Sequence, residues 1–287
     1  MNDDYRAASK QMWSTAAGGW SDHAEQLEEG PPGVAGAWMA DAIDLQPGDR
    51  VLELASGPAG VGLRVAEKVA PEGQVVLSDF AEPMVEGIRR RIAARGLANV
   101  EARVLDAEDL DVSDAEFDAV LCRFGYMLTS DPARALSETQ RVLVPGGRLA
   151  LGVWGSAEVN PWLGLPMKTL MDHLGAPPPE PGAPGPCSLG DRERLAELVE
   201  GAGFENVTVE ELEAEDRFPD ADAWWDRTLA LAAPFTAALS HLAPESAHEL
   251  EAKVKAKVKA SADEYETDDG SLAFPAVVNV ASARRPN

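Results

Sequence analysis

The chain has 287 residues, of which 45% are hydrophobic and 26% are charged, a composition typical of a folded globular protein. Its 25 basic and 49 acidic residues give a formal net charge of −24. This balance disfavours nucleic acid and anionic membranes as partners, because affinity for phosphate depends on Lys and Arg. The only two cysteines, Cys122 and Cys187, exclude a disulfide framework and a cysteine-rich zinc site.

Neither a secretory signal nor a membrane span is expected. The N-terminal stretch MNDDYRAASKQMW is acidic and has no apolar core, unlike a signal peptide. The longest uncharged stretch, 229–243, contains Pro234 and is shorter than the ~20 residues that cross a bilayer. We therefore expect a cytoplasmic protein without integral membrane association.

Residues 50–78 predict a β-α-β unit, in which the apolar run VLELA, the turn SGPAG, the helical stretch VGLRVAEKVA and the run VVLS follow one another. Such a unit forms two parallel strands with a right-handed crossover. The same alternation of apolar runs and helical stretches continues along the chain. It predicts strands at 101–106, 117–122, 148–154, 205–214 and 277–285, and helices at 83–96, 131–143 and 191–202.

This order favours one α/β domain over residues 46–287, with residues 1–45 as an N-terminal helical cover. Two segments interrupt the alternation. Residues 156–190 include six prolines between 176 and 186, which exclude a helix or a central strand there, and residues 220–264 have a helical pattern. We expect both insertions to form a lid.

In the last helix of that second insertion, Leu250, Val254 and Val258 make an apolar stripe. Lysines alternate with other residues along the same helix and indicate a solvated face. These lysines are Lys253, Lys255, Lys257 and Lys259.

The ends of the first three strands carry residues suited to binding a nucleoside. Glu53 is followed by a small-residue turn over 55–60, at the sheet edge where open α/β folds bind ligands. Asp79 stands 22 residues beyond Gly57, where a carboxylate can accept hydrogen bonds from both ribose hydroxyls. Asp106 ends the third strand, where its carboxylate and a neighbouring N–H can meet the edge of an adenine.

Simpler interpretations remain for each residue alone. Gly57 and Gly60 also suit a plain tight turn, Asp79 a helix cap, and Asp106 an ordinary turn aspartate. A nicotinamide dinucleotide would require the spacing Gly-x-Gly-x-x-Gly beside its pyrophosphate, which this turn lacks. A ligand without phosphate, with an amino-acid end near Glu53 and a ribose near Asp79, fits the pattern better.

From about Trp13 to Arg285 the sequence resembles the class I S-adenosylmethionine-dependent methyltransferases, especially the ubiquinone and menaquinone C-methyltransferases. The motifs that carry the resemblance are VLELASGPAG, VVLSDFAEPMV, VLDAEDL, FDAVLCRFGYML and RVLVPGGRLAL. It implies a Rossmann-like, mostly parallel seven-stranded sheet with an antiparallel last strand. It also implies methyl transfer from S-adenosylmethionine, by in-line displacement, to a C, O or N atom of a small, partly hydrophobic acceptor, without a metal.

The resemblance also assigns cofactor-binding roles to matching positions. Glu53 and the turn would hold the methionine moiety, Asp79 the ribose, and Arg123 would lie beside the sulfonium pocket. The full expected set is Glu53, Ala55, Ser56, Gly57, Asp79, Phe80, Met84, Asp106, Ala107 and Arg123, in which Phe80 and Met84 pack near the adenine and Asp106 and Ala107 read its edge.

The turn departs from the family pattern E/D-x-G-x-G-x-G. Ala55 and Ala59 replace the first and third glycines, which is sterically tolerable where φ is negative. Pro58 removes a backbone donor. We expect cofactor binding to survive these changes, with an altered fit around the methionine moiety.

Methyl transfer depends mainly on holding the reacting atoms in line, so a protein base is optional. His23, Tyr126 and His173 are weak candidates for that base, since a lone histidine is more often structural or exposed. Trp13 and Trp20 can close over the ligands or pack on the sheet edge. Trp224 and Trp225 are adjacent in a segment expected to be helical. Their side chains therefore point in different directions, and at most one of them can face the cleft.

Two other functions are compatible with parts of the pattern. One is a nicotinamide-dependent oxidoreductase, for which no phosphate-cradling turn or hydride site is recognisable. The other is a non-catalytic member of the methyltransferase fold that binds the cofactor as a sensor. We expect a monomer or homodimer acting on a small molecule.

Overall fold

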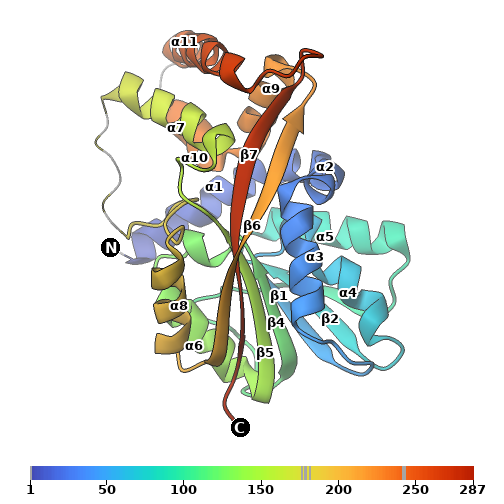
Figure 1. Cartoon of the computed structure of the whole chain (residues 1–287). Helices are drawn as coiled ribbons and strands as arrows, with labels where there is room; N and C mark the ends of the chain where they lie inside the picture. The colour runs from blue at the N-terminus through green and yellow to red at the C-terminus, as the bar shows by residue number, and fades with distance from the viewer. Residues whose placement is uncertain (1, 176, 178–179, 181, 241–243) are drawn as a thin grey trace.

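A computed structural model describes residues 2–175, 177, 180, 182–240 and 244–287 (Figure 1). Its centre is a seven-stranded sheet in the order β3-β2-β1-β4-β5-β7-β6. The strands are β1 Arg50–Leu54, β2 Gln74–Asp79, β3 Val100–Val104, β4 Phe117–Arg123, β5 Leu143–Trp154, β6 Glu205–Phe218 and β7 Leu272–Arg284. Neighbours from β3 to β5 are parallel, and β7 is antiparallel to both β5 and β6. The expected Rossmann-like sheet with an antiparallel last strand is confirmed.

Helices cover both faces of the sheet (Figure 1). One face carries α3 Pro31–Ala42, α4 Gly62–Val69 and α5 Glu82–Arg95, and the other carries α6 Pro132–Val142 and α8 Arg192–Gly201. Alternate residues of the central strands pack into the cores on the two faces of the sheet. In β1, Val51 packs on the face covered by α3, α4 and α5, and Leu52 on the face covered by α6 and α8. The alternation follows because successive side chains of a strand point to opposite faces.

The expected N-terminal cover is helical throughout, with α1 Asn2–Asp22 and α2 Ala24–Glu29 preceding α3. Helix α1 lies against α5 and α9 at the upper end of the sheet, and the indole N–H of Trp20 donates to the carbonyl of Leu231 at 3.1 Å. Helix α3 belongs to the layer on the sheet instead, because Met39 and Ala40 are buried against the strands.

The two expected insertions share a separate core above the sheet. Its helices are α7 Pro161–Leu174, α9 Ala221–Leu231, α10 Ala233–Ser240 and α11 Pro244–Ser261. Val254 and Val258 are fully buried in that core and Leu250 packs against it, which confirms the apolar stripe. On the solvated side of α11, Lys253 pairs with Glu249 at 2.6 Å. Of the proline-rich stretch, residues 176, 178, 179 and 181 lie outside the described residues.

Three short 3-10 turns complete the elements. They are η1 Gly57–Ala59, η2 Tyr126–Leu128 and η3 Asp263–Tyr265. The first two follow β1 and β4, so they stand at the ligand-binding edge of the sheet.

Strands β6 and β7 are longer than the rest of the sheet. Pairing of β7 with β5 ends at Val278, opposite Trp154, whereas its pairing with β6 continues to Leu272, opposite Phe218. A two-stranded ribbon, 213–218 paired with 272–277, therefore projects beyond β5 and carries the upper core (Figure 1).

Asn160, fully buried at the N-terminus of α7, pairs with the side of the ribbon that β5 leaves open. Its Oδ1 accepts from the N–H of Val277 at 2.9 Å, and its Nδ2 donates to the carbonyl of Val277 at 3.1 Å. The side chain thus replaces a missing strand partner.

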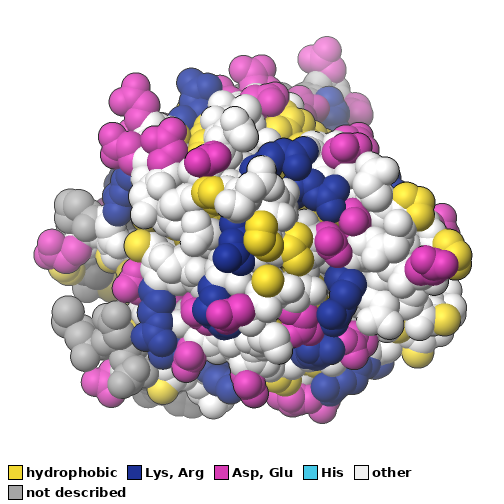
Figure 2. All heavy atoms as spheres, turned by 90° about the horizontal axis from the view of Figure 1, so that it is seen from below, with side chains coloured by type: hydrophobic (Ala, Val, Ile, Leu, Met, Phe, Trp, Pro, Cys, Tyr) yellow, Lys and Arg dark blue, Asp and Glu magenta, His cyan; other side chains and the backbone are white. Residues whose placement is uncertain are grey.

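Acidic and basic side chains alternate over the face opposite the upper core (Figure 2). The net charge of −24 is therefore not separated there into large patches of one sign. Within the described residues, no helix has both the length and the apolar character needed to cross a membrane.

Replacing Asn160 by Ala should lower the free energy of unfolding by about 1 to 3 kcal/mol, because the buried N–H of Val277 loses its acceptor. Urea unfolding monitored by tryptophan fluorescence measures the loss. Lys168→Ala on the same helix, whose side chain is 74% exposed, should change stability by less than about 0.5 kcal/mol. Equal stability of the Asn160 variant and the control would contradict the pairing role.

Candidate functional site

A large cavity lies outside the carboxyl ends of the parallel strands, with about 1950 Å³ of empty space including its open mouth. β1 has β2 on one side and β4 on the other, so the sheet reverses its strand order there, and open α/β sheets bind ligands at such a switch point. Nine of the ten residues expected to bind a cofactor line this cavity. They are Ala55, Ser56, Gly57, Asp79, Phe80, Met84, Asp106, Ala107 and Arg123.

The tenth residue, Glu53, is fully buried and does not appear in the cavity wall. Its carboxylate accepts from the N–H of Val61 at 2.8 Å and of Gly62 at 2.6 Å, at the start of α4. Burial raises the pKa of Glu53 to about 7, although the charge of Arg123 and these two N–H groups lower it. Glu53 therefore supports the turn from behind, and contact with a methionine moiety stays a prediction.

Asp79 lines the cavity and is only 7% exposed. Its carboxylate accepts from the N–H of Ala81 at 3.0 Å and of Gly57 at 3.2 Å, which ties the end of β2 to the turn after β1. Burial raises the pKa of Asp79 to about 6, while these N–H groups lower it. Asp79 does not cap α5, because Ala81 is the N-cap residue of that helix and no side chain caps it.

Asp106 makes an ion pair with Arg6 of α1 across the cavity mouth, at 2.5 Å between Oδ2 and Nη2. Its other oxygen accepts from the N–H of Glu108 at 2.9 Å. The N–H of Ala107, by contrast, has no hydrogen-bond partner within the described part of the chain. Asp106 and Ala107 both line the cavity, and their contact with an adenine edge stays a prediction. Arg6 is an additional partner of Asp106 that the sequence did not indicate.

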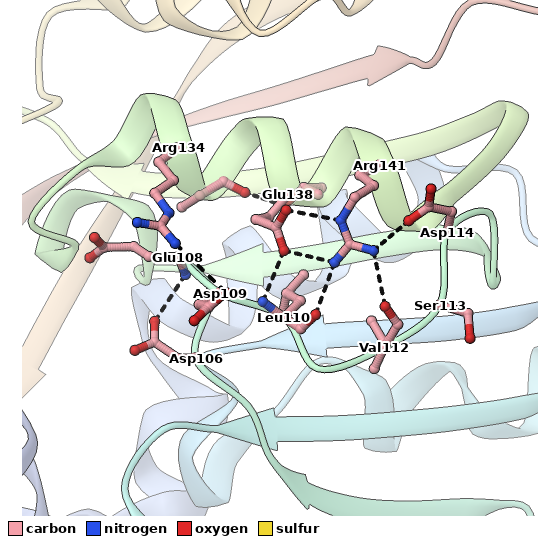
Figure 3. Close-up of polar contacts among 12 residues, drawn as sticks. Asp106, Glu108, Asp109, Leu110, Val112, Ser113, Asp114, Arg134, Glu138 and Arg141 are labelled. Carbon is pink, nitrogen blue, oxygen red and sulfur yellow. Dashed lines mark hydrogen bonds and ion pairs between the residues drawn. The ribbon is translucent and has the colours of Figure 1, made fainter.

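The loop after β3 is fixed to α6 by a network of charged groups (Figure 3). The guanidinium of Arg141 binds both carboxylate oxygens of Glu138 and donates to the carbonyls of Leu110 and Val112. Glu138 in turn accepts from the N–H of Leu110 at 2.9 Å, and Arg141 holds the pKa of Glu138 below its usual range. This network fixes the loop that presents Asp106.

Arg123 is buried in the cavity wall at the end of β4. It donates to the carbonyl of Pro32 at 2.7 Å and to the carboxylate of Glu28 at 2.8 Å. The pair joins β4 to α2 and to the start of α3, so Arg123 also anchors the N-terminal helices to the sheet.

Ala55 adopts a φ of +48°, in the left-handed region that glycine favours. The expected tolerance of alanine at this position depended on a negative φ, and the structure corrects that assumption. The backbone here follows the conformation that a glycine would adopt, and the methyl group lies 2.6 Å from where a Cβ on Gly125 would stand. Sγ of Cys122 lies equally close, at 2.6 Å, so no side chain fits at Gly125.

None of the three candidate bases lines the cavity. Tyr126 is buried, with its hydroxyl 2.6 Å from that of Thr139, and burial raises its pKa well above the usual value. His23 and His173 each place Nδ1 near a carbonyl of their own helical stretch, Gly19 and Thr169, at 2.9 and 3.0 Å. The structure thus places all three away from the ligand space, whereas Met127, next to Tyr126, lines it.

The tryptophans divide between cavity and core. Trp13 and Trp20 of α1 line the cavity, with ring centroids 5.6 Å apart in an edge-to-face arrangement. Trp224 and Trp225 are both buried in the upper core and neither lines the cavity, so the expectation that at most one would face it holds.

A cluster of aromatic rings forms part of the cavity wall. Phe124 and Trp154 stack with centroids 4.1 Å apart and planes 8° apart, and Trp162 meets Trp154 edge to face at 4.9 Å. All three line the cavity, together with Phe235 and the charged pair Asp216 and Arg227. No pattern in the sequence indicates this charged pair, because its members lie in separate elements, β6 and α9.

Within the described residues, no group of three or more His, Cys, Asp or Glu side chains is arranged to hold a metal ion.

The sequence of residues 51–147 matches the family model described as a methyltransferase domain. The chain is 42% identical over 119 residues to a demethylmenaquinone methyltransferase of Thermus thermophilus, covering 40% of this chain and 52% of that protein. It is 33% identical over 190 residues to the ubiquinone/menaquinone biosynthesis C-methyltransferase UbiE of Ectopseudomonas mendocina, covering 61% of this chain and 74% of that protein. The chain spans about half the length of the Thermus protein and of several other curated relatives that it matches.

A solved structure of similar fold is that of a putative methyltransferase from Bacillus halodurans. It superposes with a TM-score of 0.57 at 23% sequence identity, over 88% of this chain and 99% of that one. This likeness concerns the fold.

Replacing Ala55 by Gly should raise the free energy of unfolding by about 0.5 to 1 kcal/mol. The left-handed conformation costs an alanine about 1 to 2 kcal/mol, and the greater freedom of glycine in the unfolded chain offsets part of the gain. Gly57→Ala is the matched control, since Gly57 has a φ of +50° and room for a methyl group, so its stability should fall. Denaturant unfolding measures the change in the free energy of unfolding, which should be positive for Ala55→Gly and negative for Gly57→Ala. If both variants lost stability equally, the strain at Ala55 would be contradicted.

Proposed function

The chain belongs to the class I S-adenosylmethionine-dependent methyltransferases, and from this premise we propose that it transfers a methyl group from S-adenosylmethionine to a carbon, nitrogen or oxygen atom of a small, partly hydrophobic acceptor. The observation that carries the proposal is the carboxylate of Asp79. It is almost buried, lines the cavity and adjoins the turn after β1. Such a carboxylate is placed to accept hydrogen bonds from two ribose hydroxyls.

The remaining residues fit the other parts of the cofactor. The side chains of Phe80, Met84 and Leu105 offer an apolar bed for the adenine, and the open N–H of Ala107 is available to a ring nitrogen. The backbone at Ser56 and Gly57 borders the cavity, where a methionine moiety can approach closely.

When bound, the cofactor supplies an electrophilic methyl group on a positively charged sulfur. The task of the protein is then to hold the acceptor atom in line with that methyl group and to exclude water, which accounts for much of the rate gain in such reactions. The stacked rings of Phe124 and Trp154 provide a flat apolar surface for the acceptor. The names of the menaquinone-related homologues are compatible with an acceptor that contains a ring.

The cover and the lid form part of the same proposal. Helix α1 lines the cavity through Tyr5, Arg6, Ser9, Trp13 and Trp20, and the two insertions line it through residues of α7 and α9 and through Pro186. We assign to these segments the exclusion of water and the selection of the acceptor. The carbonyl of Met127 accepts from the N–H of Gly185 at 2.9 Å and the hydroxyl of Ser188 at 2.7 Å, which holds the end of the first insertion at the cavity.

S-adenosylmethionine and S-adenosylhomocysteine should each raise the melting temperature of the protein, whereas NADPH should not, because only ligands that bind the folded state stabilise it. A thermal shift assay with the three ligands tests this. Transfer of labelled methyl from the cofactor into a metabolite extract then separates an enzyme from a binding protein. A response to NADPH alone would contradict the proposed cofactor.

The affinity for S-adenosylhomocysteine should be constant above pH 7 and fall as the pH drops below about 6. The pKa of Asp79 is raised to about 6, so its carboxyl is protonated at lower pH and must lose a proton to accept from the ribose hydroxyls. The expected loss approaches tenfold per pH unit, measured by calorimetry between pH 5 and 8. Asp79→Asn should bind more weakly above pH 7 and lose this pH dependence, and an unchanged profile in that variant would rule out the ribose assignment.

Deleting residues 176–186 should alter the acceptor range and raise KM for the acceptor while leaving affinity for S-adenosylhomocysteine unchanged. Both the acceptor and the cofactor readouts are needed, because the lid is assigned to the acceptor and not to cofactor binding. If acceptor range and KM stayed as in the intact chain, the lid proposal would fail.

A further inference from the structure

A buried ion pair lies beside the aromatic cluster in the cavity wall. Asp216 lies on the projecting ribbon and is 3% exposed, and Arg227 lies on α9 and is 7% exposed. Nη2 of Arg227 donates to Oδ2 of Asp216, and both residues line the cavity. Neither residue has a part in the proposed cofactor site.

The pair keeps hydrogen-bonding capacity that the described residues do not use. Within them, Oδ1 of Asp216 and Nε and Nη1 of Arg227 have no hydrogen-bond partner. Among the described residues, the side-chain polar atoms that are enclosed by protein and lack a partner are Ser21 Oγ, Trp162 Nε1 and Asn279 Oδ1. The unused atoms of Asp216 and Arg227 do not belong to this set, so they are not enclosed. The unused groups therefore keep accessible surface, and both residues line the cavity, with an acceptor on Asp216 and further donors on Arg227.

Aromatic rings hold the pair in place. Cζ of Arg227 lies 4.0 Å from the ring centroid of Phe218 and 5.9 Å from that of Trp162. Trp162 in turn packs edge to face on Trp154. A charged pair in such surroundings is costly to retain for stability alone, since apolar residues of similar volume often serve as well.

We propose that Asp216 and Arg227 recognise one edge of the methyl acceptor, an edge that carries a hydrogen-bond donor next to an acceptor on a flat ring. A ring lactam, with adjacent N–H and C=O, or an adjacent hydroxyl and carbonyl has this pattern. Asp216 accepts from the donor, Arg227 donates to the carbonyl, and the ring packs against the aromatic side chains. Because the pair has no net charge, it suits a neutral edge better than a carboxylate or an ammonium group.

This inference rests on the proposed function, since it names the acceptor class for the same cavity. The test therefore measures cofactor and acceptor binding separately. The probes are quinolin-2(1H)-one, which has the complete N–H and C=O edge, and 1-methylquinolin-2-one, which has the same ring and carbonyl but no N–H. Each is titrated calorimetrically into the full chain saturated with S-adenosylhomocysteine.

We expect quinolin-2(1H)-one to bind at least tenfold more tightly than its N-methyl analogue, because the analogue leaves the buried oxygen of Asp216 without a donor. Arg227→Lys keeps the charge but loses the planar group of donors, and should weaken binding of quinolin-2(1H)-one at least tenfold. Asp216→Asn should reduce the preference for the N–H compound. Arg217→Lys is the matched control on the same strand, with a side chain 63% exposed, and should change nothing.

Affinity for S-adenosylhomocysteine reports separately on folding and on the proposed cofactor, and should stay as in the unsubstituted chain in all three variants. If the unsubstituted chain did not bind S-adenosylhomocysteine, the proposed function itself would fail. With that binding intact, equal affinities for the two probes, or no binding of either, would overturn the inference. If a variant lost S-adenosylhomocysteine binding through misfolding, the comparison of the two probes in the unsubstituted chain would still decide.

Discussion

The site depends on a buried carboxylate that does not line the cavity. Glu53 accepts hydrogen bonds from the first N–H groups of α4, where the helix dipole favours a negative charge. A Cβ on Gly60 would lie 2.3 Å from Oγ of Ser56 and 2.7 Å from Oε2 of Glu53. One on Gly62 would lie 2.3 Å from Cδ2 of Leu77 and 3.0 Å from the same oxygen of Glu53. Glu53 and its neighbours therefore leave no room for a side chain at either glycine, and β1, the turn and α4 form one unit.

Asp79 extends that unit to the neighbouring strand through its bond to the N–H of Gly57. The two carboxylates have different surroundings. Glu53 is enclosed by protein and bonded to a helix start, whereas Asp79 faces the cavity with part of its hydrogen-bonding capacity available. One acid thus shapes the site and the other is placed to meet a ligand. The sequence alone predicts a ligand contact for both Glu53 and Asp79, because both lie near the carboxyl end of a strand.

Local patterns predicted most of the sheet and most of the cavity wall. The strands and the residues at their carboxyl ends follow from apolar runs and turns, and parallel strands bring those ends to one edge. The pattern could not indicate that β6 continues to Phe218, because the three consecutive charged residues Glu215, Asp216 and Arg217 interrupt the alternation of apolar and polar residues that indicates a strand. It could not place α3 on the sheet either, since a helix that is apolar around most of its surface has no marked face.

The contacts that the sequence did not reveal are long-range charged pairs. Arg6 and Asp106 are 100 residues apart, and Arg123 and Glu28 are 95 apart. With 49 acidic residues in the chain, no local signal selects the partner of a given arginine. His23 and His173 do not line the cavity. The sequence could not indicate this, since a histidine that bonds its own helix has the same sequence appearance as one that faces a ligand.

The projecting ribbon of β6 and β7 has a consequence for divergence among related enzymes. The cofactor end of the cavity is built from the ends of the parallel strands, whereas Asp216 and the upper core are carried by the ribbon beyond β5. Substitutions at the ribbon tip and in the helices on it can therefore accumulate without disturbing the nucleoside-binding edge. Related enzymes can therefore change their methyl acceptor while they keep the same methyl donor.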